Sequence, residues 1–118
     1  MELQIIEQRK LLIAEFVSAQ RVINTPQDAL DAMGNADYNG ARSIIFYEHQ
    51  LHPDFFNLSS GLAGEILQKF SNYHMKLAIV GEFRYDSKPL QAFIIECNRG
   101  KHVFFVPSRD QAIQKLSA

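Results

Sequence analysis

The chain has 118 residues, which is enough for one domain with a sizeable core and too few for two. Its formal net charge is −1, and its lysines and arginines are scattered along the sequence. Because nucleic-acid-binding proteins concentrate positive charge on one surface, this composition argues against a nucleic-acid partner. Cys97 is the one cysteine, so neither an internal disulfide nor a zinc site built from cysteines can form.

The N-terminal region and the apolar runs indicate where the protein works. The first residues lack the basic start and the apolar stretch of a signal peptide. No apolar run approaches the roughly 20 residues that a membrane-spanning helix needs. We therefore expect a cytoplasmic protein that forms a single domain over residues 1–118, with no membrane contact and no bound cofactor.

The first half of the chain predicts a hairpin, a helix and a buried strand. Residues 3–7 and 11–17 are β-rich runs joined by a short connection, which is typical of an antiparallel hairpin. A hydroxyl and a proline at residues 25–26 predict a helix start, and this helix is expected to end near residues 34–37. The apolar run 43–47 then predicts a strand covered on both faces.

The central stretch changes from an aromatic loop into an amphipathic helix. Phe55 and Phe56 lie in the loop, and Ser59, Ser60 and Gly61 follow them. After the glycine, apolar residues recur at helical spacing with polar residues between them. We expect one of the two serines to cap this helix, since a serine oxygen accepts a bond from a first-turn N–H group.

Two more pairs of strand and helix complete the chain. The apolar runs 77–80 and 103–106 predict strands, and helices are expected to begin after Ser87 and Ser108. The predicted order is therefore β-β-α-β-α-β-α-β-α. This order indicates an α/β fold with a mainly parallel central sheet and the opening hairpin as its antiparallel edge.

That order, with a Ser-Ser-Gly-Leu sequence at residues 59–62, resembles the STAS domain (sulfate transporter and anti-sigma-factor antagonist). In that family, a partner kinase phosphorylates a serine or threonine of an Asp-Ser-Ser-Gly motif and thereby switches binding to a regulatory protein. The resemblance implies that Ser60 is the phosphoacceptor, with Ser59 and Gly61 beside it. Leu58 stands where the family has its acidic residue.

A second resemblance covers nearly the whole chain and is carried by three separated segments. They are residues 54–70, which contain the aromatic loop and the central helix, residues 76–83, and residues 96–106. Together they resemble a bacterial family catalogued as a domain of unknown function, DUF4180. The resemblance implies a small cytoplasmic bacterial protein and brings no activity with it.

The predicted topology gathers polar residues at one rim of the sheet. In open parallel sheets, ligands bind beyond the carboxyl ends of the strands. We expect carboxylates, imidazoles and arginines to share this rim and to hold a small anionic ligand. The candidate rim residues are Glu48, His49, His52, Asp54, Arg84 and Arg99.

The same loop residues allow two further arrangements. His49 and His52 have the spacing of a metal-binding pair, but Pro53 places them in a loop rather than on a helix, so we expect no metal site. Ser60, His49 and Asp54 contain the groups of a hydrolase triad, but the Gly-x-Ser-x-Gly sequence of a nucleophile elbow is absent. A solvated loop is the simpler interpretation of both.

The sequence favours a non-enzymatic, STAS-like regulatory module over an enzyme. This module binds a protein partner, or a second copy of itself, through residues 55–65. We expect one of Phe55 and Phe56 to pack in the core and the other to contact the partner. The alternative function is a sensor or enzyme that holds an anionic metabolite at the rim. A third interpretation is a structural homodimer formed by the exposed edge hairpin.

Overall fold

The protein, described here by a computed structural model of residues 2–118, has the predicted order of elements. Its first half contains strands β1 (Leu3–Gln8) and β2 (Leu11–Phe16), helix α1 (Pro26–Tyr38) and strand β3 (Ser43–Tyr47). Its second half contains α2 (Leu62–Asn72), β4 (Lys76–Val80), α3 (Lys88–Arg99), β5 (Val103–Val106) and α4 (Arg109–Leu116). Within residues 2–118, no helix is both long enough and apolar enough to cross a membrane.

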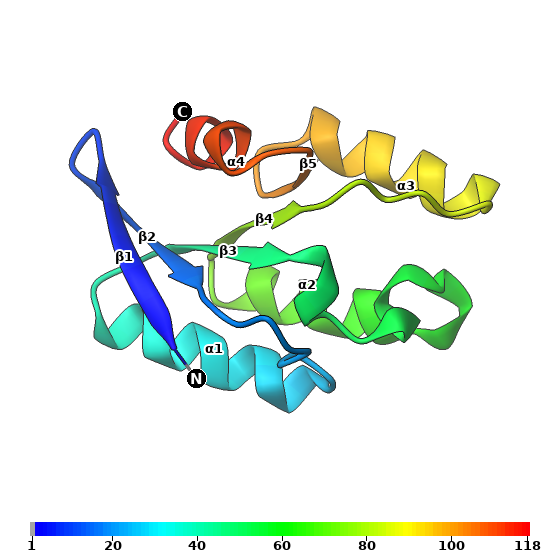
Figure 1. Ribbon diagram of the computed structural model, residues 1–118, viewed down its shortest axis with the longest axis horizontal. Coiled ribbons are helices and arrows are strands. Elements are labelled where there is room, and N and C mark those ends of the chain that lie inside the picture. The colour runs from blue at the N-terminus through cyan, green and yellow to red at the C-terminus, as the bar shows by residue number, and fades with distance from the viewer. Residues whose placement is uncertain (1) are drawn as a thin grey trace.

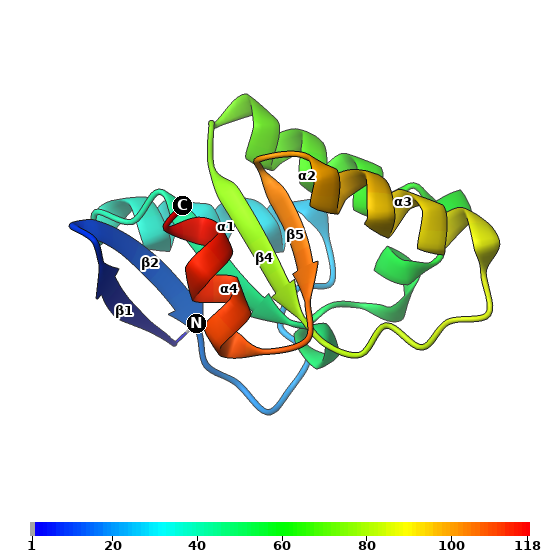
Figure 2. The ribbon, with the colours of Figure 1, turned by 90° about the horizontal axis from the view of Figure 1, so that it is seen from above.

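The five strands lie in the sheet in the order in which they follow along the chain. β1 pairs antiparallel with β2, and each later pair of neighbours is parallel, which confirms the predicted sheet and its edge hairpin. The four strands β2 to β5 therefore end on the same side, and Figure 2 shows the arrowheads of β4 and β5 close together there. We call this side the carboxyl edge.

Helices cover the two faces of the sheet unequally. Strands added in one direction through right-handed crossovers place α1, α2 and α3 on the same face. The larger core cluster agrees, because it joins residues of these three helices to Phe46, Ile79 and Phe105 of the sheet. On the other face, Ala112 and Leu116 of α4 pack on a smaller cluster. Figure 1 shows α1 and α4 on opposite sides of the sheet.

Helix α1 begins where the sequence predicts and ends later. The Thr25 hydroxyl accepts the N–H of Asp28 at 3.1 Å, and the Asp28 carboxylate accepts the N–H of Thr25 at 3.2 Å, so the two residues form a capping box. The predicted end near residues 34–37 is too early, because the helix continues to Tyr38. The helix passes the predicted range by one residue, and the fully buried Ala36 continues its packed stripe into the last turn.

The hairpin turn consists of two residues with unusual backbone angles. Arg9 has a φ of 53° and Lys10 a φ of 66°, which are the left-handed angles of a type I′ turn. Asn-Gly is the usual sequence at these positions because most side chains disfavour positive φ. The turn therefore forms here without its usual sequence signal.

The segment before α2 is more ordered than the predicted loop. It forms three short 3-10 helices, η1 (Glu48–Gln50), η2 (Pro53–Phe56) and η3 (Leu58–Ser60). Gly61, with a φ of 82°, is the residue that caps α2, and it makes no side-chain bond. The expected serine contact is nevertheless present, because the Ser60 hydroxyl accepts the N–H of Leu62 at 3.2 Å.

Candidate functional site

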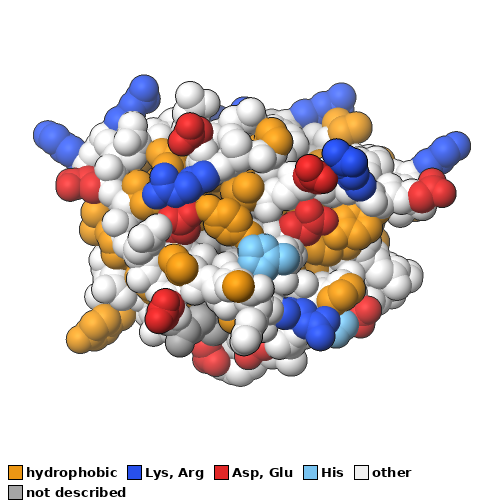
Figure 3. Space-filling model, viewed as in Figure 1, with side chains coloured by type: hydrophobic (Ala, Val, Ile, Leu, Met, Phe, Trp, Pro, Cys, Tyr) orange, Lys and Arg blue, Asp and Glu red, His pale blue; other side chains and the backbone are white. Residues whose placement is uncertain are grey.

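A pocket of about 590 Å³ opens at the carboxyl edge, where the connections after β2, β3 and β4 meet. Its volume lies in the range of small-molecule sites. The polar residues that line it are Arg21, Tyr47, Glu48, His49, Glu82 and Tyr85. The remaining lining residues are Leu51, Pro53, Phe56, Val80 and Gly81. Figure 3 shows charged, histidine and hydrophobic side chains side by side in the middle of this face.

The Glu48 side chain is fixed on one wall of this pocket by the chain that follows β4. One carboxylate oxygen accepts the backbone N–H groups of Glu82 at 3.1 Å and of Phe83 at 3.3 Å. The other oxygen accepts the hydroxyl of Tyr85. Two successive N–H groups that converge on an anion form a nest, and the positive φ of Phe83, 55°, belongs to that geometry.

Gly81 makes room for Glu48. A Cβ atom built on Gly81 would lie 2.6 Å from the Cβ of Glu48, a distance that real Cβ atoms do not show. The absence of a side chain at Gly81 thus allows the carboxylate to reach the N–H groups of Glu82 and Phe83. The pocket wall therefore depends on a glycine at the end of β4 and a glutamate at the end of β3.

The two carboxylates that line the pocket have partners within the chain, whereas the lining arginine does not. The Glu48 carboxylate is held by the nest and by Tyr85, and Glu82 forms an ion pair with Arg84 at 3.1 Å. Within the described part of the chain, the Arg21 guanidinium makes no hydrogen bond or ion pair. Arg21 is therefore the lining charge that an anionic ligand would complement.

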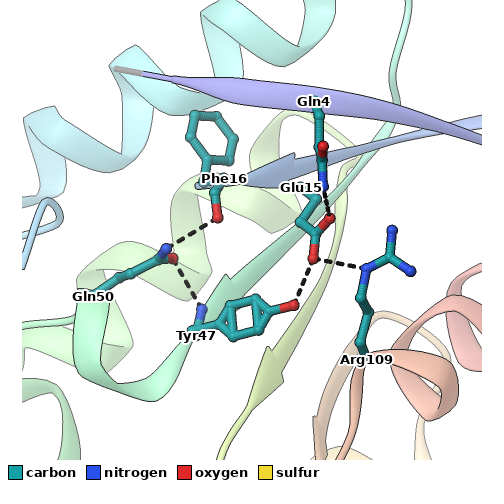
Figure 4. A network of polar contacts seen from close by, with 6 residues as sticks. All are labelled: Gln4, Glu15, Phe16, Tyr47, Gln50 and Arg109. Carbon is teal, nitrogen blue, oxygen red and sulfur yellow. Dashed lines mark hydrogen bonds and ion pairs between the residues drawn. The ribbon is translucent and has the colours of Figure 1, made fainter. Parts of the chain in front are cut away.

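A second polar cluster lies beside the pocket and shares Tyr47 with it (Figure 4). Its centre is Glu15 on β2, whose side chain is only 5% exposed. Gln4 and the Tyr47 hydroxyl each donate to this carboxylate at 2.5 Å, and the Arg109 Nε donates at 3.0 Å. The cluster thus joins β1, β2, β3 and α4 around one buried charge.

Hydrogen bonding determines the protonation of this cluster. Burial alone would raise the pKa of Glu15, but the bonds from Tyr47, Arg109 and Gln4 outweigh it and lower that pKa below its ordinary value. Burial and the bond to Glu15 raise the pKa of Tyr47 to about 12. Burial, with the bond to Glu48, raises the pKa of Tyr85 as well. At neutral pH, Glu15 is therefore charged and both phenols are neutral.

A second glutamine, Gln50, connects the strands next to the pocket by hydrogen bonds. The Gln50 side chain, which is buried, donates to the carbonyl oxygen of Phe16 at 3.0 Å and accepts the N–H of Tyr47 at 3.0 Å (Figure 4). It ties the end of β2 to the end of β3. His49, next to it, contacts the carbonyl oxygen of Ser18 through its Nε2 at 2.8 Å.

The structure brings some of the predicted rim residues together. Glu48 and His49 both line the pocket. His52 and Asp54 lie in the next turn, where the His52 ring accepts the N–H of Asp54 at 3.0 Å, and they do not line it. The Arg84 side chain is 82% exposed and also lies outside the pocket lining.

Arg99 lies apart from the other predicted rim residues. It is the last residue of α3, which leads into the beginning of β5, and it pairs with Glu96 at 3.7 Å. It is therefore near the amino ends of the strands rather than at the carboxyl edge. In the described residues, no group of three His, Cys, Asp or Glu side chains is arranged to hold a metal ion.

Phe55 and Phe56 do not divide between core and partner as the sequence suggested. Both rings are buried, at 1% and 5% exposure, so the expectation of one exposed partner contact is wrong. A 3-10 turn lets both neighbours point inward, whereas a strand would alternate them. The Phe56 ring stacks on Tyr85 with centroids 4.9 Å apart and forms part of the pocket wall.

The two serines lie at the exposed start of α2. Ser60 donates to the carbonyl oxygen of Asp54 at 2.6 Å, and Ser59 donates to the Asn57 side chain at 2.8 Å. His49 bonds to Ser18, Ser60 bonds to a backbone oxygen, and the Asp54 carboxylate lies 3.8 Å from His52, so the three groups considered as a hydrolase triad contact other partners. Gly61 follows without a side chain, so this surface is small and polar.

The sequence did not point to Arg21 or Gly81 as pocket residues, or to Glu15 as the centre of a buried cluster. Arg21 lies in the connection from β2 to α1, which has no periodic pattern. Its one available signal was topological, because a strand that is parallel to β3 must also end at the carboxyl edge. Gly81 carried a weaker signal as the residue that ends an apolar run.

Comparison with known proteins gives the family of the chain. A search of the curated proteins and a search of the solved structures found no match. The family model described as "Domain of unknown function (DUF4180)" matches residues 8–116, which includes every element of the pocket and of the Glu15 cluster except β1. The chain therefore belongs to the DUF4180 family.

Proposed function

We propose that this protein is a non-enzymatic sensor that binds a small anionic metabolite in the pocket at the carboxyl edge. The observation that carries the proposal is the charge of Arg21, which lines the pocket and has no ionic or hydrogen-bonding partner among residues 2–118. Both lining carboxylates already have partners. A carboxylate or phosphate group of a ligand supplies the missing negative charge.

The rest of the pocket suits the body of such a ligand. Leu51, Phe56 and Val80 supply apolar contacts, and the outer ring of the stacked pair, Tyr85, is held in place by Glu48. Small-molecule sites typically combine an apolar wall with few polar groups that orient the ligand. The neutral Tyr47 hydroxyl donates its hydrogen bond to Glu15, so Tyr47 contributes its ring to the pocket wall and does not donate a proton to the ligand.

A thermal-shift screen tests this proposal. Dicarboxylates, tricarboxylates, sugar phosphates and nucleoside phosphates are added separately, and the melting temperature is recorded. A ligand at about one hundred times its dissociation constant stabilises the folded state by about 2.7 kcal/mol, which corresponds to roughly 10 °C in a domain of this size. We expect at least one class to give such a shift.

Matched arginine variants decide whether the pocket is responsible. Arg21→Ala removes the unpaired charge and should abolish the shift, whereas Arg99→Ala, at the other end of the sheet, should retain it. A shift that survives Arg21→Ala, or a panel in which no anion binds, would contradict the proposal.

A regulatory interaction through the start of α2 is the second candidate function. Its support is the exposed position of Ser60, whose hydroxyl lies between the carbonyl oxygen of Asp54 and the N–H of Leu62. The resemblance to STAS domains implies phosphorylation at this serine. A phosphate there would break the bond to Asp54 and add about two negative charges beside the N–H groups of the helix start.

Mass spectrometry of the protein from bacterial cells tests the second candidate. A phosphate mapped to Ser60, and lost in Ser60→Ala but retained in Ser71→Ala near the end of α2, would support it. If neither Ser59 nor Ser60 carries phosphate under any growth condition, these serines only stabilise the start of α2.

A further inference from the structure

The two edge strands of the sheet, β1 and β5, differ in whether a side chain pairs with their outward backbone groups. The carbonyl oxygens of His102 and Val106 accept the N–H groups of Leu77 at 2.8 Å and of Gly81 at 3.0 Å. Because alternate residues of a strand direct their backbone groups to the same neighbour, the N–H and C=O groups of Phe105 on β5 point away from β4. Asn98 of α3 covers this edge: its side-chain oxygen accepts the N–H of Phe105 at 2.8 Å, and its amide donates to the carbonyl oxygen at 3.1 Å. The amide thus takes the place of a neighbouring strand and blocks further pairing on β5.

Among residues 2–118, no side chain forms a hydrogen bond with the outward backbone groups of the edge strand β1. The N–H of Val17 donates to the carbonyl oxygen of Glu2 at 3.1 Å, so Glu2 and Val17 form a hydrogen-bonded pair. Because such pairs alternate along an antiparallel ladder, the even-numbered residues of β1 point their backbone groups towards β2. The backbone N–H and C=O groups of Leu3, Ile5 and Glu7 therefore point away from the sheet. Figure 2 shows β1 as its outermost strand on that side.

We propose that the β1 edge binds the β1 edge of a second copy of this chain, which forms a symmetric dimer with a continuous sheet. An antiparallel register centred on Ile5 pairs Ile5 with its counterpart and Leu3 with Glu7 of the second copy. This register uses the outward groups of all three residues. The Ile5 side chain, 37% exposed in the single chain, then packs against its counterpart.

Charge along the hairpin favours the same antiparallel arrangement. β1 follows the acidic residue Glu2 and ends at the basic turn Arg9–Lys10. In the register centred on Ile5, Glu2 lies beside the basic turn of the second copy, and the reverse contact forms across the two-fold axis. A parallel pairing would place like charges together, which costs stability.

The blocked β5 edge limits the assembly to two chains. A symmetric contact between identical edges is closed, whereas an open second edge would allow the sheet to grow into a fibre. Since β1 contributes no residue to the pocket lining, the dimer forms or fails independently of ligand binding. The fold thus leaves one edge available and covers the other.

Sedimentation velocity and light scattering from low micromolar to sub-millimolar concentration test the dimer. The wild-type protein should reach twice the chain mass of 13.5 kDa. Ile5→Lys places a charge at the centre of the interface, and Ile5→Pro removes an outward N–H without touching a bond to β2. Both variants should have the mass of a single chain. Ile95→Lys, at another exposed isoleucine (53%) on α3, should remain a dimer.

Cysteine cross-linking tests the register and does not depend on how well the proline variant folds. Paired Cα atoms at a hydrogen-bonded position lie about 5.5 Å apart, within reach of a disulfide. Ile5→Cys should form a disulfide-linked dimer on mild oxidation. Glu7→Cys, on the same edge but away from the axis, and the wild-type chain with Cys97 should not. A wild-type monomer at the highest concentration, or a dimer that survives Ile5→Lys, would overturn the proposal.

Discussion

Arg109 of α4 donates to the buried carboxylate of Glu15 on β2 at 3.0 Å, which joins residues from the two ends of the chain. The Glu15 side chain is 5% exposed, whereas the Arg109 side chain is 45% exposed. Removing the arginine leaves a buried carboxylate with Tyr47 and Gln4 only. Because water can reach the arginine's position, the loss is smaller than for a fully buried pair.

We expect Arg109→Ala to lower the free energy of unfolding by about 1 kcal/mol, measured by urea denaturation. Arg84→Ala is the matched control, since its ion pair with Glu82 is exposed on both sides, at 82% and 73%. That variant should change stability by less than about 0.5 kcal/mol. Equal effects of the two substitutions would show that the Glu15 contact is no stronger than a surface pair.

Acid should weaken the protein through Glu15. The pKa of this carboxyl is lower in the folded chain than in the unfolded chain, so folding releases a proton near that pH. Its stabilising contribution is therefore fully present above the unfolded pKa of about 4.3 and is lost as pH falls through the folded pKa. Urea unfolding from neutral pH to pH 3 should show a steeper loss for the wild type than for Glu15→Gln. Parallel curves would contradict this assignment.

High pH should also lower the stability of the protein, through deprotonation of Tyr47. The pKa of Tyr47 is raised to about 12 in the folded chain, compared with about 10 for a free phenol. The contribution of the protonated phenol is thus fully present below about pH 10 and is lost as pH rises towards 12. Wild type and Tyr47→Phe should converge in stability over this interval. A constant difference would mean that the Tyr47 proton does not support the Glu15 cluster.

Gly81→Ala should damage the pocket wall. The added Cβ would lie 2.6 Å from the Cβ of Glu48, so either the glutamate or the chain after β4 must move. We expect a destabilisation of about 2 kcal/mol, typical of overpacking. Combined with Glu48→Gly, which removes the Cβ of residue 48, the substitution should cost less than the sum of the two single effects, because the clash is relieved. Additive effects in the double-mutant cycle would contradict this.

Lys10→Gly should stabilise the hairpin. Lys10 has a φ of 66°, an angle that glycine adopts without steric cost. The gain should be about 0.5–1 kcal/mol, reduced by the greater freedom of glycine in the unfolded chain. Lys101→Gly, at an exposed residue after α3, is the control for loss of a surface lysine. Thermal melts in which Lys10→Gly is no more stable than the wild type would contradict the prediction.

Local patterns predict most of the fold because they coincide with what the tertiary structure needs. The capping residues Thr25, Ser87 and Ser108 accept the N–H groups of the helices that follow, as expected. The apolar strands are buried, and their order makes the sheet parallel. The hairpin turn at Arg9–Lys10 and the inward turn of both Phe55 and Phe56 depend on backbone angles for which these residue types give no signal.

The candidate site was only partly predictable for a related reason. Glu48 and His49 follow a recognisable strand, so their place at the carboxyl edge follows from topology alone. Arg21 reaches the same pocket from a connection without a periodic pattern. Glu15 is the one polar residue of the apolar strand β2, and Tyr47 and Arg109 of α4 surround its carboxylate. The roles of Arg21 and Glu15 can be recognised only once the positions of the strands in the sheet are known.

A native mass spectrum of the protein, purified gently from bacterial cells, tests the proposed function most directly. We expect a chain of 13.5 kDa that carries one additional small-molecule mass, whether the chain is single or paired. The additional mass should be absent from Arg21→Ala and present in Arg99→Ala. A wild-type spectrum with only the bare chain mass, together with no response to any anion in the thermal-shift panel, would contradict the proposed function.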